Sequence, residues 1–335
     1  MAENSKIEWT DATWNPITGC SVVSPGCTNC YAMKLAGTRL QHHPSRAGLT
    51  NPTKSGPVWN GKVSLNRNWL AQPLEWKKPR MVFVCAHGDL FHDEVPDKWI
   101  LDIYTIMAIA QQHTFQVLTK RADRMHDFLS RSDLLEEIYA NWYTFSGNAR
   151  EVWTWPLSNV WLGVSVEDQK RANERIPLLL DTPAAIRWIS AEPLLGPLDL
   201  NSNMGGTQWI GGQRGCGGTH RHGGRSGEVI HGVMHVADPL TAHHHHDDRC
   251  APGLDWVVTG GESGTAARAM QPDWARSLRD QCSAAKVPFF FKQWGNYAPL
   301  LSATTKDTMY RATKNIAGRL LDGREHNAMP EVRKS

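Results

Sequence analysis

The feature that most constrains the fold is a series of short apolar runs that alternate with longer amphipathic segments. The runs are rich in β-branched and aromatic residues and almost continuous in hydrophobicity, which is typical of parallel strands buried on both faces. They lie at Met81–Cys85, Phe115–Thr119, Val160–Val166, Ile186–Ser190, Trp256–Thr259 and Pro288–Lys292. The pattern therefore predicts a parallel sheet.

The segments between these runs have helical spacing. They lie at Lys98–Gln112, Arg124–Ser130, Leu134–Ala140, Gln169–Leu180 and Pro272–Ala285. A strand followed by a helix, repeated along the chain, indicates βα units. A length of 335 residues suits a single α/β barrel that carries insertions. We therefore expect an α/β fold with one parallel, barrel-like sheet.

One stretch, residues 201–253, departs from this pattern because it is rich in Gly and His. Such a composition cannot form a packed core by itself, so we interpret the stretch as an insertion between the Ile186–Ser190 and Trp256–Thr259 runs. The expected organisation is one barrel domain from residues 1–200 and 254–300, the insertion at 201–253, and a C-terminal extension at 301–335.

Polar or glycine residues lie at or just after the carboxyl end of each predicted strand. In a parallel barrel these ends open onto one face, where the active site lies. The candidates for a common cavity are His87, Gly88, Asp89, Lys120, Arg121, Ser165, Glu167, Glu192, Gly261, Glu262 and Lys292. For each residue taken alone, the alternative is that a strand end is polar because it reaches solvent.

These side chains suggest separate roles. Lys120 and Arg121 suit a carboxylate or phosphate, and Ser165 and Glu167 suit ribose hydroxyls. A carboxylate after a buried strand needs a partner, so we expect Glu192 and Glu262 to pair with a cation such as Lys120, Arg121 or Lys292, or with an ammonium group on a ligand. A purely structural ion-pair network is the alternative. The glycines, Gly88 and Gly261, allow a ligand to approach the backbone closely.

Three of the seven cysteines, Cys20, Cys27 and Cys30, fall within eleven residues. This clustering favours metal ligation in a reducing compartment over a disulfide framework. Three thiolates bind three irons of a [4Fe–4S] cluster and leave the fourth open for the amino and carboxylate groups of S-adenosylmethionine (SAM). Zinc is the alternative, although a structural zinc site normally takes four ligands and no fourth lies nearby in the sequence.

The cysteine motif occurs together with the segments FVCAHGDLFH, FQVLTKR, WLGVSVED, ISAEPLLGPL, WVVTGGESG and FFFKQWG. In these segments, over residues 7–295, the chain resembles the phage-associated Gp37/Gp68 family, also called DUF5131. The three-cysteine motif of that family is similar to that of radical SAM enzymes such as spore photoproduct lyase. One departure is that the usual radical SAM spacing is C-x3-C-x2-C, whereas the first gap here is six residues.

The resemblance implies a partial (β/α)6 barrel of the radical SAM kind. It also implies a [4Fe–4S] cluster on Cys20, Cys27 and Cys30, and cleavage of SAM to methionine and a 5′-deoxyadenosyl radical that abstracts hydrogen from a substrate. The segment that contains His87, Gly88 and Asp89 stands where radical SAM enzymes bind the methionine ammonium. By the resemblance, Asp89 accepts a hydrogen bond from that ammonium.

The Gly/His-rich insertion is a candidate second metal site. Its metal-ligating side chains include Cys216, His220, His222 and Cys250, and zinc is the metal that such a set suits best. The alternative is a flexible polar lid or a partner-binding loop beside the open face of the barrel.

Charge and hydropathy limit the classes of function. The formal charge is only +3, so a contact with nucleic acid has to be a local basic patch. No apolar run is long enough to span a membrane and no signal peptide is evident, so we expect a cytoplasmic protein without a membrane partner.

We expect a radical SAM enzyme whose substrate is a nucleic acid, nucleotide or peptide. The alternative is a catalytically silent phage-encoded homologue that binds a host or phage protein. A third class, a zinc-dependent nucleic-acid binder, leaves the strand-end residues unexplained.

Overall fold

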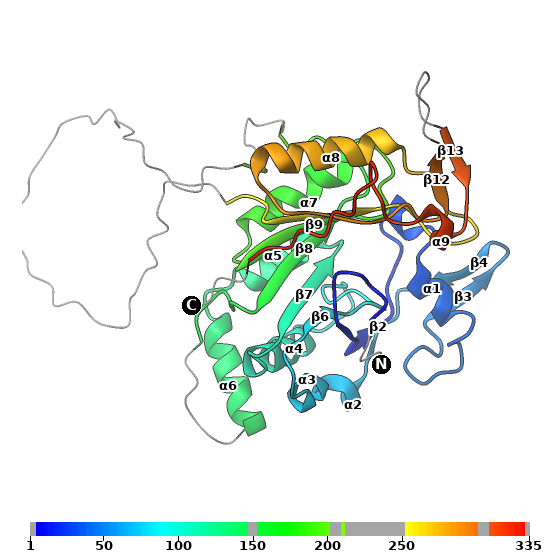
Figure 1. Ribbon diagram of the computed structural model, residues 1–335. Coiled ribbons are helices and arrows are strands. Elements are labelled where there is room, and N and C mark those ends of the chain that lie inside the picture. Colours follow the sequence, from blue (N-terminus) through cyan, green and yellow to red (C-terminus); the bar gives the residue numbers. More distant parts are fainter. Residues whose placement is uncertain (1–4, 147–152, 202–208, 212–251, 301–307, 332–335) are drawn as a thin grey trace, which may run out of the picture.

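The computed structural model describes residues 5–146, 153–201, 209–211, 252–300 and 308–331. The fold is mixed α/β, and its central element is a sheet of seven parallel strands that curls into a half-barrel (Figure 1). The strands are β1 (Ala12–Trp14), β6 (Met81–Val84), β7 (Thr114–Thr119), β8 (Val160–Ser165), β9 (Ile186–Ala191), β10 (Trp256–Gly260) and β11 (Phe289–Gln293). Their order in space follows their order in the chain.

All six predicted strands are confirmed, and the fold is consistent with a TIM-like α/β architecture. The prediction of six strands was one strand short. The seventh, β1, pairs with β6 in parallel register, with Ala12 opposite Val82 and Trp14 opposite Val84. Three residues are too few to produce a recognisable hydrophobic run, so β1 becomes visible only through its pairing.

Five helices connect these strands and cover the outer face of the half-barrel (Figure 1). They are α4 (Asp97–Ile109), α5 (Ala122–Leu129), α6 (Leu134–Ser146), α7 (Gln169–Asp181) and α8 (Pro272–Ala285). The predicted helices are confirmed, and the limits of α8 agree with the prediction at both ends. At the start of α7 the side chain of Asp168 accepts a hydrogen bond of 2.8 Å from the backbone N–H of Arg171, which is a standard N-cap.

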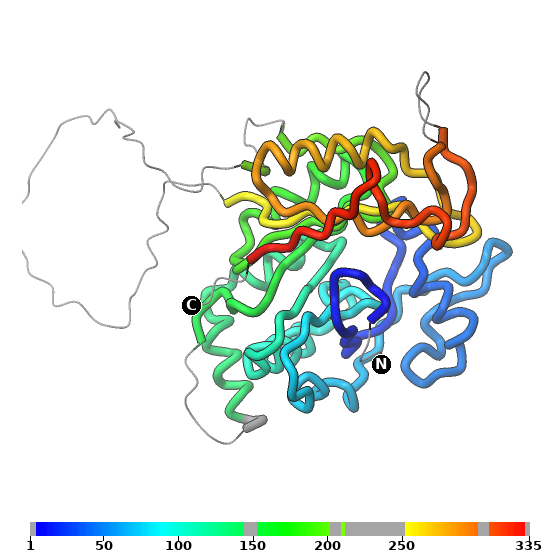
Figure 2. The backbone as a smooth tube through the Cα atoms, in the orientation of Figure 1, coloured from blue at the N-terminus to red at the C-terminus, as the bar shows by residue number. Residues whose placement is uncertain are grey.

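Part of the chain between β1 and β6, from Cys20 to Trp59, contributes to a wall facing the carboxyl ends of the strands. The whole segment between β1 and β6 contains β2 (Ile17–Thr18), the short 3-10 helix η1 (Pro25–Cys27), α1 (Tyr31–Ala36), β3 (Thr50–Thr53), β4 (Gly56–Trp59), β5 (Ser64–Leu65), α2 (Arg67–Leu70) and α3 (Gln72–Glu75). The hairpin β3–β4 packs closely on the end of α1. The glycine there, Gly37, leaves room for this contact, since a Cβ at that position would lie only 2.0 Å from Pro57. Figure 2 shows this part of the chain in blue beside the half-barrel.

Two apolar clusters stabilise the fold. The larger lies between the sheet and the helices and includes Phe115, Ile100 and Leu278. The smaller is aromatic and fills the concave face, where Trp9 lies with its ring centroid 4.9 Å from Phe83 and 5.3 Å from Trp188. Gly163 makes room for the indole of Trp188, since a Cβ there would lie 2.4 Å from the ring. The concave face is therefore packed with aromatic rings.

The C-terminal residues contact the last strand of the sheet. The hairpin β12 (Tyr297–Leu300) and β13 (Thr308–Arg311) is followed by α9 (Lys314–Ala317). Further along, Asn327 forms an antiparallel bridge with Phe290 of β11. The predicted second metal site, Cys216, His220, His222 and Cys250, lies outside the described residues. Within the described residues, none of the helices has the length and apolar character needed to span a bilayer.

Candidate functional site

A cavity of about 650 Å³ lies at the carboxyl ends of the parallel strands. One wall consists of residues at the ends of β6 to β11 and in the turns that follow them. The opposite wall consists of α1, β4 and the segment Cys20–Cys30, which we call the cysteine loop. Because active sites of parallel barrels lie at this end, the cavity is the candidate functional site.

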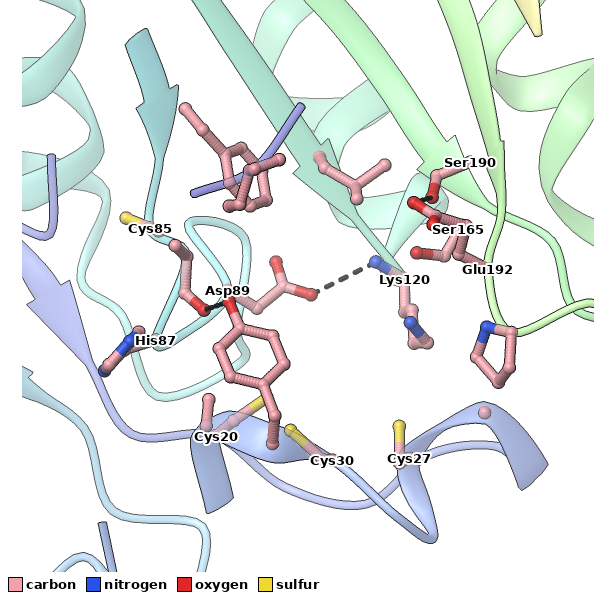
Figure 3. A pocket seen from close by; sticks show the side chains of 18 of the residues that line it. Cys20, Cys27, Cys30, Cys85, His87, Asp89, Lys120, Ser165, Ser190 and Glu192 are labelled. Carbon is pink, nitrogen blue, oxygen red and sulfur yellow. Dashed lines mark hydrogen bonds between the residues drawn. The ribbon is translucent and has the colours of Figure 1, made fainter. Parts of the chain in front are cut away.

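All three cysteines of the loop line this cavity. Figure 3 shows their sulfur atoms along one side of it, facing the strand ends. Each is a free thiol: Cys20 follows β2, Cys27 ends η1, and Cys30 immediately precedes α1. Two tight turns set this spacing, because the N–H of Cys27 donates to the carbonyl of Ser24 (2.9 Å) and the N–H of Cys30 donates to the carbonyl of Cys27 (3.2 Å).

The three thiols are not arranged like the ligands of a single ion. Among the described residues, no group of three or more His, Cys, Asp or Glu side chains is placed to hold a metal ion. A zinc site needs its ligands around one atom, whereas a [4Fe–4S] cluster takes one thiolate per iron and so spreads them apart. The described residues therefore contain no preformed site for a single metal ion.

Glu167 holds the cysteine loop through a hydrogen bond to its backbone. Its carboxylate is fully buried, accepting from the N–H of Gly26 at 3.1 Å and from Arg175 at 3.1 Å. Burial alone would raise the pKa of Glu167, but hydrogen bonding from Ser24 and the charges of Lys120 and Arg175 hold it below its usual value. Glu167 does not line the cavity, so the contact with a ribose that we expected is not the one it makes.

Glu262 provides a second anchor for the same loop. Its carboxylate accepts from Arg268 at 2.6 Å and from the side-chain amide of Asn29 at 3.0 Å. Arg268 in turn donates to the carbonyl of Pro25 at 3.0 Å. The expectation that Glu262 has a cationic partner is met by Arg268, a residue that the sequence analysis did not single out.

Asp89 is buried, and its carboxylate accepts four hydrogen bonds. The donors are the N–H of Phe91 (3.0 Å), the hydroxyl of Thr119 (2.7 Å), the N–H of Lys120 (3.1 Å) and the guanidinium of Arg121 (2.9 Å). Most of its hydrogen-bonding capacity is therefore used by the chain itself. This geometry favours a role of Asp89 in positioning Arg121 over the expected contact with a ligand ammonium.

Arg121 links this carboxylate to the cysteine loop. Its guanidinium donates to the hydroxyl of Ser21 at 2.6 Å and to the sulfur of Cys20 at 3.6 Å. Burial and the neighbouring Asp89 charge raise the pKa of Cys20 to about 12, while Arg121 acts in the opposite direction. In the chain by itself Cys20 is thus a thiol, and ligation by a metal is what would deprotonate it.

The far side of the cavity has the polar groups that are least engaged. Lys292 lies 3.3 Å from Glu192, as expected for a strand-end pair, and the hydroxyl of Ser190 is 3.4 Å from the same carboxylate. Ser165 and Lys120 line the cavity beside them (Figure 3). Within the described residues the amine of Lys120 has no hydrogen bond or ion pair, so it is available to an anionic ligand group.

His87 and the two glycines complete the predicted set. Arg46 donates to Nδ1 of His87 at 2.8 Å, and burial together with this positive charge lowers the pKa of His87 to about 4. A Cβ at Gly88 would lie 3.0 Å from the carbonyl of Ile17, and one at Gly261 only 2.0 Å from that of Trp294. The close backbone approaches that we expected from a ligand are therefore made by the chain.

The structure thus brings thirteen of the fourteen predicted cysteine and strand-end positions to one cavity, with Glu167 buried behind it. Sequence reasoning missed Arg46 and Arg268. Arg46 lies 41 residues from His87, so the only available signal was that a buried His requires a partner. Arg268 lies six residues after Glu262, so its nearness in the chain was a signal that the sequence analysis did not use.

Comparison with known proteins gives one match. A family model described as "Protein of unknown function (DUF5131)" matches residues 4–330. No curated protein and no solved structure matches the chain.

Proposed function

The chain belongs to the DUF5131 family, and from the geometry of its site we propose that it is a radical SAM enzyme whose [4Fe–4S] cluster is bound by Cys20, Cys27 and Cys30. The observation that carries the proposal is that all three thiols of one loop line a 650 Å³ cavity at the carboxyl ends of a parallel half-barrel. A cavity of this size is in the range of cofactor and small-molecule sites.

The donor set fits this cofactor. Three free thiols that line one cavity suit a cluster with one open iron, whereas a closed zinc site normally takes four ligands around one ion. When bound, such a cluster supplies the electron that cleaves SAM and yields a 5′-deoxyadenosyl radical for hydrogen abstraction. The chain's own residues hold, orient and shield the reacting groups.

The cysteine loop is held at two points by buried carboxylates. Glu167 binds the N–H of Gly26, and the Glu262–Arg268 pair binds Asn29 and the carbonyl of Pro25. Both carboxylates lie beyond the ends of central strands, so the position of the thiols is tied to the sheet. Such preorganisation is what a positioned cofactor requires.

The remaining polar groups suit the two ends of an amino acid such as the methionine part of SAM. The Lys120 amine is suited to a carboxylate, and Glu192 is the partly exposed carboxylate that is best able to accept from an ammonium. Asp89, in contrast, already accepts four hydrogen bonds. We therefore assign ammonium binding to Glu192 and the positioning of Arg121 to Asp89.

The test is anaerobic reconstitution with iron and sulfide, followed by addition of dithionite and SAM. We expect bound iron and sulfide, and release of 5′-deoxyadenosine. Cys27→Ala should lose both the iron and the nucleoside. Cys282→Ala is the matched control, because Cys282 is also a buried free cysteine but lies in α8, away from the cavity; it should keep both.

The possible results separate the functional classes. Iron without nucleoside would favour the silent homologue that binds a protein partner. Zinc without iron would favour the zinc-dependent class. Retention of iron by Cys27→Ala would contradict the assignment of the ligands.

A further inference from the structure

One segment of the chain has no acidic residue although it forms a wall of the candidate site. Between Asp11 and Glu75 the sequence contains six Lys and Arg residues and no Asp or Glu. The whole chain carries a charge of only +3, so the rest of the protein is net acidic. A concentration of one charge sign on an otherwise balanced protein indicates a surface for a partner of opposite charge.

Five cations of this segment are accessible: Arg39, Lys54, Lys62 and Arg67 are exposed and Lys34 is half-buried. Four of them, Lys34, Arg39, Lys54 and Lys62, lie on or next to α1 and the β3–β4 hairpin. We call these four residues the basic rim. Within the described residues none of them forms an ion pair, and the segment has no acidic residue that could supply one. The charge of the basic rim is thus not neutralised by the part of the protein that the structure describes.

The basic rim lies beside the cavity. Leu35, next to Lys34 on α1, and Trp59 of β4 both line the cavity. The amine of Lys34 is 3.6 Å from the position that a Cβ on Gly264 would take, in the loop that follows β10. The amine of Lys34 on α1 therefore lies close to the loop that follows β10, which belongs to the strand-end side of the cavity.

Lys62 borders the cysteine loop from another direction. It lines a second, open hollow of about 580 Å³ that shares Ser21 with the main cavity. Lys54 belongs to the turn of the β3–β4 hairpin, which packs on α1. The basic rim is therefore carried by α1, the β3–β4 hairpin and the residues next to them, and the hairpin contacts α1 through β4.

An exposed aromatic ring lies at the same place. Tyr31 is 52% exposed and also lines the cavity. Its hydroxyl donates to the carbonyl of Ala86 at 2.7 Å, which fixes the ring. An exposed, fixed aromatic side chain beside unpaired cations is the usual platform on which a nucleobase stacks.

We propose that the substrate of this site is a nucleic acid, with its phosphates on the basic rim and one unstacked base at Tyr31. A cavity of 650 Å³ admits a nucleotide but not a duplex, so the reacting base has to leave the stack or come from a single strand. The chemical step rests on the function proposed above. The binding step does not, because it needs neither cluster nor SAM.

The first test measures binding by fluorescence anisotropy. The full-length protein, with and without reconstitution, is titrated with labelled single-stranded DNA of about 20 nucleotides, RNA of the same sequence, and the duplex. The charge variant is Lys34→Glu with Arg39→Glu and Lys54→Glu. Its control is Lys77→Glu with Lys78→Glu, because these exposed lysines precede β6 and so lie at the opposite end of the strands.

We expect the unmodified protein to bind single strands, with an affinity that falls as salt rises. The triple variant should bind at least about tenfold more weakly for every sequence, and its salt slope should be smaller by about three, since each lost phosphate contact removes about one. The control should stay within about twofold, a difference expected from general charge alone.

The second test concerns the ring. Tyr31→Leu removes the stacking surface and should weaken single-strand binding roughly tenfold or more. Tyr31→Phe keeps the ring and removes only the hydroxyl that contacts Ala86, so it should bind nearly as the parent does. Equal losses in both variants would mean that the hydroxyl, and not stacking, holds the segment.

Other outcomes would overturn the inference. Equal binding by the triple variant and its control would remove the basic rim as the surface. Binding to vesicles that contain phosphatidylserine, without binding to nucleic acid, would identify an anionic membrane as the partner instead. Formation of 5′-deoxyadenosine without nucleic-acid binding would refute this inference alone, whereas binding without cleavage of SAM would refute only the proposed chemistry.

Discussion

The guanidinium of Arg121 lies 3.6 Å from the sulfur of Cys20. The same group is 2.9 Å from the carboxylate of Asp89, and both side chains of this ion pair are buried. A cation held beside a thiol favours its ionised form, and Asp89 holds that cation in place. The strand-end motif and the cysteine motif, separate in the sequence, therefore form one electrostatic unit.

The first prediction concerns this ion pair. Arg121→Gln leaves the Asp89 carboxylate buried without its cation, which typically costs about 3–5 kcal/mol of unfolding free energy. Arg171→Gln is the control, because its pair with Glu174 lies at the surface of α7 and should contribute less than about 1 kcal/mol. Urea unfolding of the two variants measures the difference. A similar loss of unfolding free energy in both variants would show that the buried pair contributes no more to stability than the surface pair.

The second prediction separates the two carboxylates. Glu192→Gln should weaken SAM binding by roughly ten- to a hundredfold, since a charge-assisted hydrogen bond contributes about 1.5–3 kcal/mol, and iron content should stay near that of the parent. Asp89→Ala should lower stability and iron retention first. Equilibrium dialysis with SAM and an iron assay give both quantities. The reverse pattern, in which Asp89→Ala keeps iron and loses SAM binding, would show that Asp89 and not Glu192 binds the ammonium group.

The third prediction concerns pH. The pKa of Glu167 is held below its ordinary value of 4.5, so its contribution to stability is complete above about pH 4.5 and is lost as the pH falls through the lowered pKa. Glu167→Gln should destabilise the protein at neutral pH, because Arg175 loses its buried partner. This destabilisation should shrink in acid. Thermal unfolding from neutral to acidic pH checks it; a constant difference would contradict the ion-pair role.

Local patterns were sufficient to identify most of the sheet and its helices. Each of the six predicted strands is a run of adjacent apolar residues, and α8 starts at a proline, Pro272, which favours the first turn of a helix. Cys20, Cys27 and Cys30 are close in the chain, so their common place on the cavity also follows from local spacing. These features depend on neighbouring residues, and a single sequence displays them directly.

The contacts between the buried carboxylates and the cysteine loop were decided only by the tertiary structure, whereas the cationic partners of Glu167 and Glu262 are eight and six residues away in the chain. Gly26 and Glu167 are 141 residues apart, and Asn29 and Glu262 are 233 apart. The sequence indicated that each carboxylate needs a partner, because an unpaired buried charge is costly. Which loop donor each carboxylate contacts depends on how the cysteine loop packs across the strand ends, since hydrogen bonds act over a few ångströms in space, whatever the separation along the chain.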